Sequence, residues 1–228
     1  MLGAIGFIVA AIAILGFVWS CQKAYVQVDP FRLWAFCFAF TLMAVSMLLW
    51  AMITIVADPV VTQNFMLATD VLLLLGTAAM IMVATGRPTM LQATLLAGVV
   101  ALTVSYRAYL QPPTAYVQDG LLFFNLLGAS RLVIVGIFAF IWLPVAMYFA
   151  SQIAQSNPIM RTRTWTFQIY FVALAAVFGM FAKAQRSAAI IALFIIMIAL
   201  FGLLALFNVT LTKMQPIKRG KTHAARKA

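Results

Sequence analysis

Asp70 is the residue of this chain best suited to chemistry in an apolar setting. It is the only acidic residue inside a long apolar stretch, Phe65–Ala84, and the chain has only four acids, all aspartates. A carboxylate in hydrocarbon is costly unless it is paired, hydrated or protonated, so it is a candidate proton or cation site, or an anchor for a ligand. Arg131 is the nearest candidate partner in depth, and Lys183 comes next. A purely structural ion pair between helices is the alternative.

Other residue types used in catalysis or metal binding are scarce. The single histidine, His223, lies in the basic C-terminal segment, so no apolar stretch contains one. This excludes haem held by two histidines, histidine-ligated zinc and Ser–His or Cys–His nucleophiles from those stretches. No second acid accompanies Asp70 for acid–base work, and no glycine-rich phosphate loop is present. The sequence predicts a protein that is not an enzyme and carries no metal or other cofactor.

Cys21 and Cys37 are the only two thiols, and their spacing does not form a CxxC motif. Both lie near the predicted inner ends of apolar segments. Small packing residues are the favoured interpretation, because a free cysteine behaves as a small apolar side chain. A disulfide bond or a metal site remains the alternative.

Pro144 and Trp142 lie together in a later apolar segment. Proline inside a helix removes a backbone hydrogen bond and bends the helix. The pair is therefore a candidate hinge beside a cavity, with a static kink as the simpler interpretation.

The composition places all these residues in a membrane. Of the 228 residues, 66% are hydrophobic and 8% are charged, whereas a soluble domain carries roughly 25% charged residues. The net charge of +11 comes from basic residues at segment ends and in the C-terminal tail. This distribution indicates membrane topology and not a surface for nucleic acid.

Seven segments meet or approach the roughly 20 residues that a membrane-spanning helix needs. They predict an all-α integral membrane protein, a bundle of seven transmembrane helices within residues 1–212. Residues 121–127 are predicted to be an interfacial piece. Helices one to three could be a parallel copy of helices five to seven. The predicted spans are 2–20, 34–57, 65–84, 90–106, 130–152, 164–182 and 188–211.

The orientation follows from the basic residues, which concentrate on the cytoplasmic side of membranes. Their distribution predicts that the N-terminus is outside and the C-terminus inside, with Trp19, Trp34 and Trp165 at the inner interface. The tail, residues 213–228, is predicted to be disordered and to bind anionic lipid headgroups. Its membrane-surface residues are Lys218, Arg219, Lys221, Arg226 and Lys227.

These features favour a non-catalytic protein that works by association. It would be an accessory or structural subunit of a membrane complex, or a membrane sensor, with other membrane subunits or further copies of itself as partners. The absence of a cleavable presequence favours a prokaryotic plasma (inner) membrane. The alternative is a small-solute transporter or channel that uses Asp70 near the outer face. Binding of a pigment or lipid without a covalent bond is a third option.

Overall fold

The computed structural model describes residues 2–24, 30–56, 58–85, 89, 114–125, 165, 169, 172–173, 176–177, 180 and 184–214. Its elements are the helices α1 (Leu2–Ala24), α2 (Pro30–Val56), α3 (Pro59–Thr85) and α7 (Ser187–Met214), and the strands β1 (Thr114–Gln118) and β2 (Leu121–Asn125). Each of the four helices contains a span long and apolar enough to cross a membrane. The protein is therefore a mostly helical, multi-pass membrane protein.

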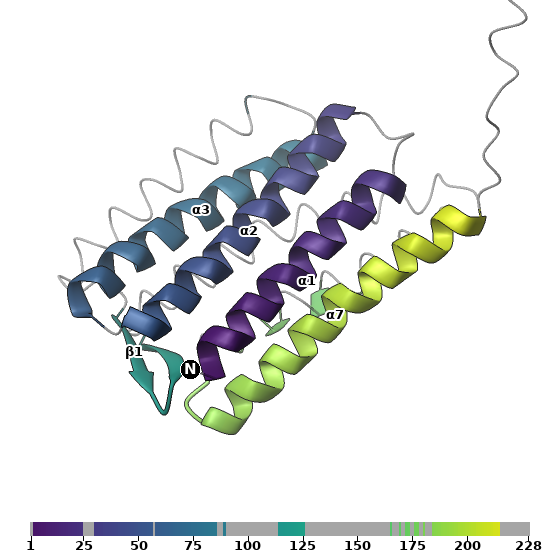
Figure 1. Cartoon of the computed structure of the whole chain (residues 1–228). Helices are drawn as coiled ribbons and strands as arrows, with labels where there is room; N and C mark the ends of the chain where they lie inside the picture. Colours follow the sequence, from purple (N-terminus) through teal and green to yellow (C-terminus); the bar gives the residue numbers. More distant parts are fainter. Residues whose placement is uncertain are drawn as a thin grey trace, which may run out of the picture.

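The four helices lie side by side in the order α3, α2, α1, α7 (Figure 1). α1 and α2 are antiparallel, because Phe7 contacts Trp50 near one end of the pair and Phe17 contacts Phe40 near the other. Ten residues forward along α1 thus correspond to ten residues back along α2, which fixes their register.

α1 and α7 run parallel to each other. Phe7 contacts Phe194 near the start of both helices, and Cys21 accepts a hydrogen bond from Asn208 near their ends. The starts of α1, α3 and α7 therefore lie at one end of the bundle, together with the end of α2 (Figure 1). We call this the hairpin end, because β1 and β2 also lie there, and we call the opposite end the cysteine end.

Asp58 determines where α3 begins. Its Oδ1 accepts hydrogen bonds from the backbone N–H groups of Val60 and Val61, at 2.9 and 3.0 Å. Pro59 occupies the first helical position, where its missing N–H has no consequence. The sequence predicted that Asp58 and Pro59 separate two helices, and this is confirmed. The predicted start of the second helix of this pair, Phe65, is six residues too late, because the prediction ended the apolar run at the polar residues Thr62, Gln63 and Asn64, whereas the Asp58 cap starts the helix before them.

Other helix boundaries also extend beyond the prediction, including the start of α2 at Pro30 instead of residue 34. α1 continues past residue 20 to Ala24, and α7 continues past residue 211 to Met214. Residues 213 and 214 are thus helical and do not belong to the tail. The predicted spans 90–106 and 130–152 lie outside the described residues, as does part of the predicted repeat. Every described residue within the predicted span 164–182 is helical.

A β-hairpin corrects the all-α prediction. β1 and β2 pair antiparallel through a two-residue loop of Asp119 and Gly120, which have φ angles of 53° and 72°. Positive φ at both loop residues is typical of a type I′ turn, for which Asp-Gly is a preferred sequence. The described part of the predicted interfacial piece at 121–127, Leu121–Asn125, is instead a strand, and Leu121, Leu122 and Phe123 are buried.

The hairpin is attached to the start of α1 by its backbone. The N–H of Gly3 donates a hydrogen bond of 2.9 Å to the carbonyl oxygen of Gly120. This satisfies one of the N–H groups that the first turn of a helix leaves without a partner. A Cβ atom at position 3 would lie 2.7 Å from that same oxygen. Only glycine allows the two backbones to approach this closely.

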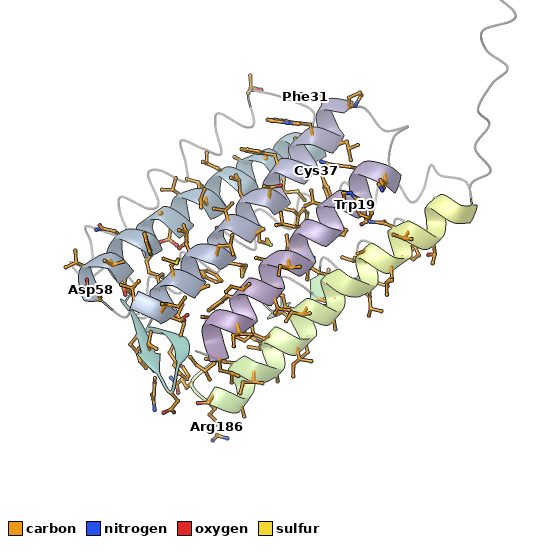
Figure 2. The ribbon with its side chains drawn as sticks, viewed as in Figure 1. Trp19, Phe31, Cys37, Asp58 and Arg186 are labelled. Atoms are coloured by element: carbon orange, nitrogen blue, oxygen red, sulfur yellow. The ribbon has the colours of Figure 1, made fainter. Side chains whose placement is uncertain are left out.

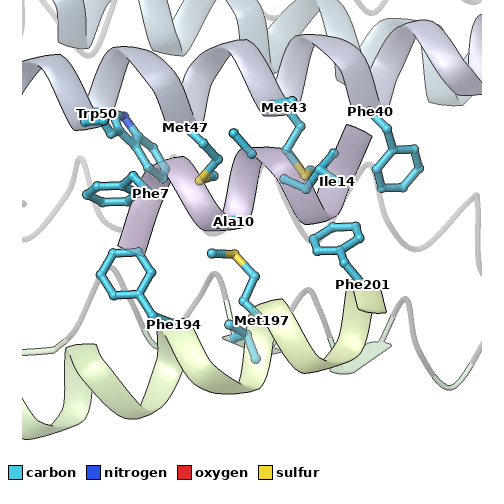
Figure 3. Packing of buried hydrophobic residues seen from close by; sticks show 14 of the residues in the cluster. Phe7, Ala10, Ile14, Phe40, Met43, Met47, Trp50, Phe194, Met197 and Phe201 are labelled. Atoms are coloured by element: carbon cyan, nitrogen blue, oxygen red, sulfur yellow. The ribbon is translucent and has the colours of Figure 1, made fainter. Parts of the chain in front are cut away.

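The core between α2, α1 and α7 is built from aromatic, methionine and aliphatic side chains (Figure 3). Phe17 is its centre towards the cysteine end, with ring centroids 5.2 Å from Phe40, 5.8 Å from Phe201 and 6.1 Å from Phe36. Because lipid is as apolar as these side chains, close packing and not burial from water holds the helices together.

Candidate functional site

Asp70 lies farther from the start of its helix than the sequence predicted. The candidate span within α3 begins at Val60, ten residues before Asp70, and the helix continues for fifteen residues after Asp70, to Thr85. At the α-helical rise ten residues correspond to about 15 Å, which is half of a hydrocarbon core of about 30 Å. The depth predicted from a helix beginning at Phe65 was only about 8 Å. The early start of α3 therefore places this carboxylate deeper below the hairpin end of the bundle than the sequence predicted.

Asp70 lies beside a hydroxyl that is turned to its own helix. Its side chain is partly buried. The neighbouring hydroxyl of Thr69 is buried and donates a hydrogen bond of 2.7 Å to the carbonyl oxygen of Met66. Among the described side chains, none forms a hydrogen bond or ion pair with Asp70. The predicted partners Arg131 and Lys183 lie outside the described residues, so their pairing with Asp70 stays a prediction.

A buried polar cluster, which the sequence analysis missed, lies near the cysteine end. Asn208 of α7 donates from Nδ2 to the hydroxyl oxygen of Ser20 at 3.1 Å and to the sulfur of Cys21 at 3.3 Å. Ser20 in turn donates to the carbonyl oxygen of Phe17 at 2.7 Å. The three polar residues are each at most 2% exposed. An asparagine in a long apolar segment is itself a signal for such an interhelical contact.

The second thiol lies at the same level of the bundle. The register of α1 and α2 places Cys21 opposite Phe36, the residue before Cys37. Both cysteines are buried and free. The sequence placed the two cysteines near the same membrane face, and the structure places them at the same level of two neighbouring helices.

Aromatic residues surround the cysteine end on its outer surface (Figure 2). The ammonium group of Lys23 lies 3.6 Å from the centroid of the Trp19 ring, as a cation–π pair. On α2, the Trp34 ring stacks between Phe31 and Phe38, with centroid separations of 6.4 and 5.1 Å. Exposed tryptophan and lysine at one level are typical of the membrane–water interface. The prediction that Trp19 and Trp34 lie at the same end is thus supported.

The other predicted site residues cannot be placed. Pro144, Trp142 and the basic residues of the tail lie outside the described residues. Within the described parts of the chain, no group of three or more histidine, cysteine, aspartate or glutamate side chains is arranged to hold a metal ion.

Comparison with protein-family models, with curated proteins and with solved structures finds no match for this chain.

Proposed function

We propose that this protein is non-catalytic and works by association within the bilayer, as an accessory or structural subunit of a membrane complex or as a membrane sensor. The packing of α1 supports this proposal. Its inner face is buried against aromatic and methionine side chains, whereas Ile5 and Ile12 on its outer face are exposed. The described core between α2, α1 and α7 is mainly apolar, with a few buried polar side chains such as Ser20 and Asn208. Such a bundle is suited to presenting apolar faces to lipid or to other helices.

The proposed orientation puts the cysteine end in the cytoplasm and the hairpin end outside, in a prokaryotic plasma membrane. Two observations support it. Lys23 and the interfacial tryptophans Trp19 and Trp34 gather at the cysteine end, and α7 leads from there into the basic C-terminal tail. Basic residues favour the cytoplasmic side, where they attract anionic headgroups.

Extraction in a mild detergent, followed by size-exclusion chromatography and mass spectrometry of the peak, tests the proposal. We expect a particle that contains several chains in a fixed ratio, either different subunits or copies of this one. The ratio should persist when the peak is diluted and run again. Elution as a single chain under the mildest conditions would overturn the association proposal. An absorption spectrum of the same peak tests for a bound pigment.

The depth of Asp70 favours a second candidate function, the passage of a proton or small cation through the bundle. A carboxylate inside a membrane span can bind and release a cation where neither bulk phase reaches it directly. The partial exposure of the side chain is compatible with such exchange. The transporter or channel predicted from the sequence used Asp70 near the outer face. In the function proposed here Asp70 is again the ion-binding residue, but it lies deeper in the membrane.

Replacing Asp70 with asparagine separates the two candidates, because it removes the charge and preserves the shape. If Asp70 carries ions, the proton or sodium flux of the variant in sealed vesicles should be at least about tenfold lower than that of the wild type. A tenfold decrease corresponds to an increase of about 1.4 kcal/mol in the barrier. Asp119→Asn is the matched control, since Asp119 is exposed in the hairpin loop, and it should leave the flux unchanged. A wild-type protein without flux, or an Asp70→Asn variant with full flux, would remove the transport candidate.

A further inference from the structure

Three helices bring two thiols and an amide to one level of the bundle. Cys21 comes from α1, Cys37 from α2 and Asn208 from α7, and each is at most 5% exposed. The cysteines are the only two in the chain. Two buried free thiols at one level of neighbouring, packed helices are a candidate pair of metal ligands, because packing alone would require only small apolar side chains at these positions.

The Asn208 amide distinguishes this site from ordinary packing. Its Nδ2 group donates a hydrogen bond of 3.3 Å to the sulfur of Cys21 while it also donates to Ser20. A donor aimed at sulfur stabilises negative charge there, as do the groups that surround the ligands of metal sites. The hydroxyl of Ser20 donates to the carbonyl oxygen of Phe17 in its own helix, and its oxygen accepts from the Asn208 amide, which holds that amide beside Cys21.

We propose that Cys21 and Cys37 together bind one soft monovalent cation of the Cu(I) class. The two thiols each lose a proton to solvent, and the two sulfur–metal bonds replace the two sulfur–hydrogen bonds. Two thiolates and one monovalent cation leave a single negative charge, which the Asn208 amide partly offsets. No electron is transferred, so the reaction needs neither an oxidant nor a reductant.

The chemistry of the site selects this class of cation. Thiolates are soft ligands that prefer Cu(I), whereas Mg²⁺ and Ca²⁺ require oxygen ligands. Zn²⁺ takes four ligands in a structural site, and the described residues supply only two thiols here, with no third histidine, cysteine or acid beside them. Two thiols on neighbouring helices suit a cation that accepts two ligands in a line.

The site also has a short route to water. Cys21 is two residues from Lys23, where the span of α1 ends, and Cys37 is four residues from Leu33, where the span of α2 begins. At the helical rise these separations are about 3 and 6 Å. A cation and the released protons would therefore cross about one helical turn. Asp70 is on a different helix and at a different depth, so this site is independent of the proposed function.

Competition for Cu(I) tests the proposal on the purified, reduced, full-length protein. Under anaerobic conditions the protein is titrated into the coloured Cu(I)–bicinchoninate complex, and the loss of colour reports transfer. We expect one Cu(I) per chain, with two sulfur ligands in the copper X-ray absorption spectrum. Cys21→Ser and Cys37→Ser should each abolish competition. Asn208→Ala should weaken it about 10- to 100-fold, as the loss of a partner around a metal ligand does.

Matched controls make the result decisive. Asn64→Ala removes an exposed asparagine of α3 and should leave Cu(I) binding unchanged. Alkylation of the two thiols can be measured on the wild-type protein, without any variant. One equivalent of Ag(I), a soft monovalent cation like Cu(I), should protect both thiols from alkylation together. Cu(I) binding that persists in the thiol-free double variant would assign the metal to methionines and overturn the proposal. A purified protein whose mass is lower by two hydrogen atoms, with the cysteines joined, would overturn it in favour of a disulfide.

Discussion

Replacing Phe17 with alanine is expected to destabilise the fold by about 2–4 kcal/mol, the largest effect of any single side chain in the described core. Phe17 is fully buried and contacts Phe36 and Phe40 of α2 and Phe201 of α7. Its removal leaves a cavity at the junction of three helices. The expected loss is smaller than the largest values for soluble cores, because lipid is as apolar as this interior and the transfer contribution is reduced.

Unfolding by dodecyl sulfate in mixed micelles, followed by circular dichroism, measures this difference. Phe31→Ala is the matched control, because Phe31 is 54% exposed and its ring stacks on that of Trp34 near the start of α2. The control should change the unfolding free energy by less than about 1 kcal/mol. Equal effects of the two substitutions would show that Phe17 is not the centre of the core.

The helices were predictable from the sequence because their signal is simple. An apolar run of membrane length predicts a span whatever surrounds it, and the four described helices α1, α2, α3 and α7 all overlap their predicted segments. Their ends were less predictable, because a helix end depends on caps and on neighbours. The side chain of Asp58 begins α3 six residues before the predicted segment, which started at Phe65, and this places Asp70 farther along its helix.

The sequence contains a pattern that predicts the β-hairpin, but a prediction based on hydropathy does not consider it. Asp119-Gly120 stands between two stretches of strand-forming residues, which is the strongest local pattern for a two-residue turn. The continuous apolar run after Gly120 resembled a membrane segment because β2 is buried by its contact with α1 and α2. A buried strand and a membrane-embedded helix have the same composition, so composition alone cannot separate them.

One candidate site could be predicted from the sequence and the other could be predicted only in part. Asp70 was found from the sequence because a lone acid in an apolar run is rare. A disulfide or metal site at Cys21 and Cys37 was only an alternative in the sequence, and the contribution of Asn208 was not found, because it lies far from both cysteines in the chain. Their meeting depends on the antiparallel register of α1 with α2 and on the parallel alignment of α1 with α7. Neither alignment follows from the composition of the segments.

Gly3→Ala and Gly16→Ala are expected to have opposite effects, although both add one methyl group to α1. At Gly3 the methyl carbon would lie 2.7 Å from the backbone oxygen of Gly120, which no side-chain rotation can relieve. We expect a loss of about 1–3 kcal/mol from overpacking, together with the hydrogen bond between the two glycines. At Gly16 nothing lies within 4 Å, so alanine should be neutral or gain up to about 1 kcal/mol through helix propensity.

Hydrogen exchange of the hairpin amides distinguishes a local effect from a global one. Because Gly3 binds the hairpin loop directly, its substitution should speed exchange in β1 and β2 by about tenfold per 1.4 kcal/mol lost, while α2 and α7 keep their protection. Gly16→Ala should leave hairpin exchange unchanged. If Gly3→Ala instead leaves hairpin exchange at the wild-type rate, the close approach of Gly3 and Gly120 does not hold the hairpin. The buried side chains of Leu121, Leu122 and Phe123 would then be its main attachment to the helices.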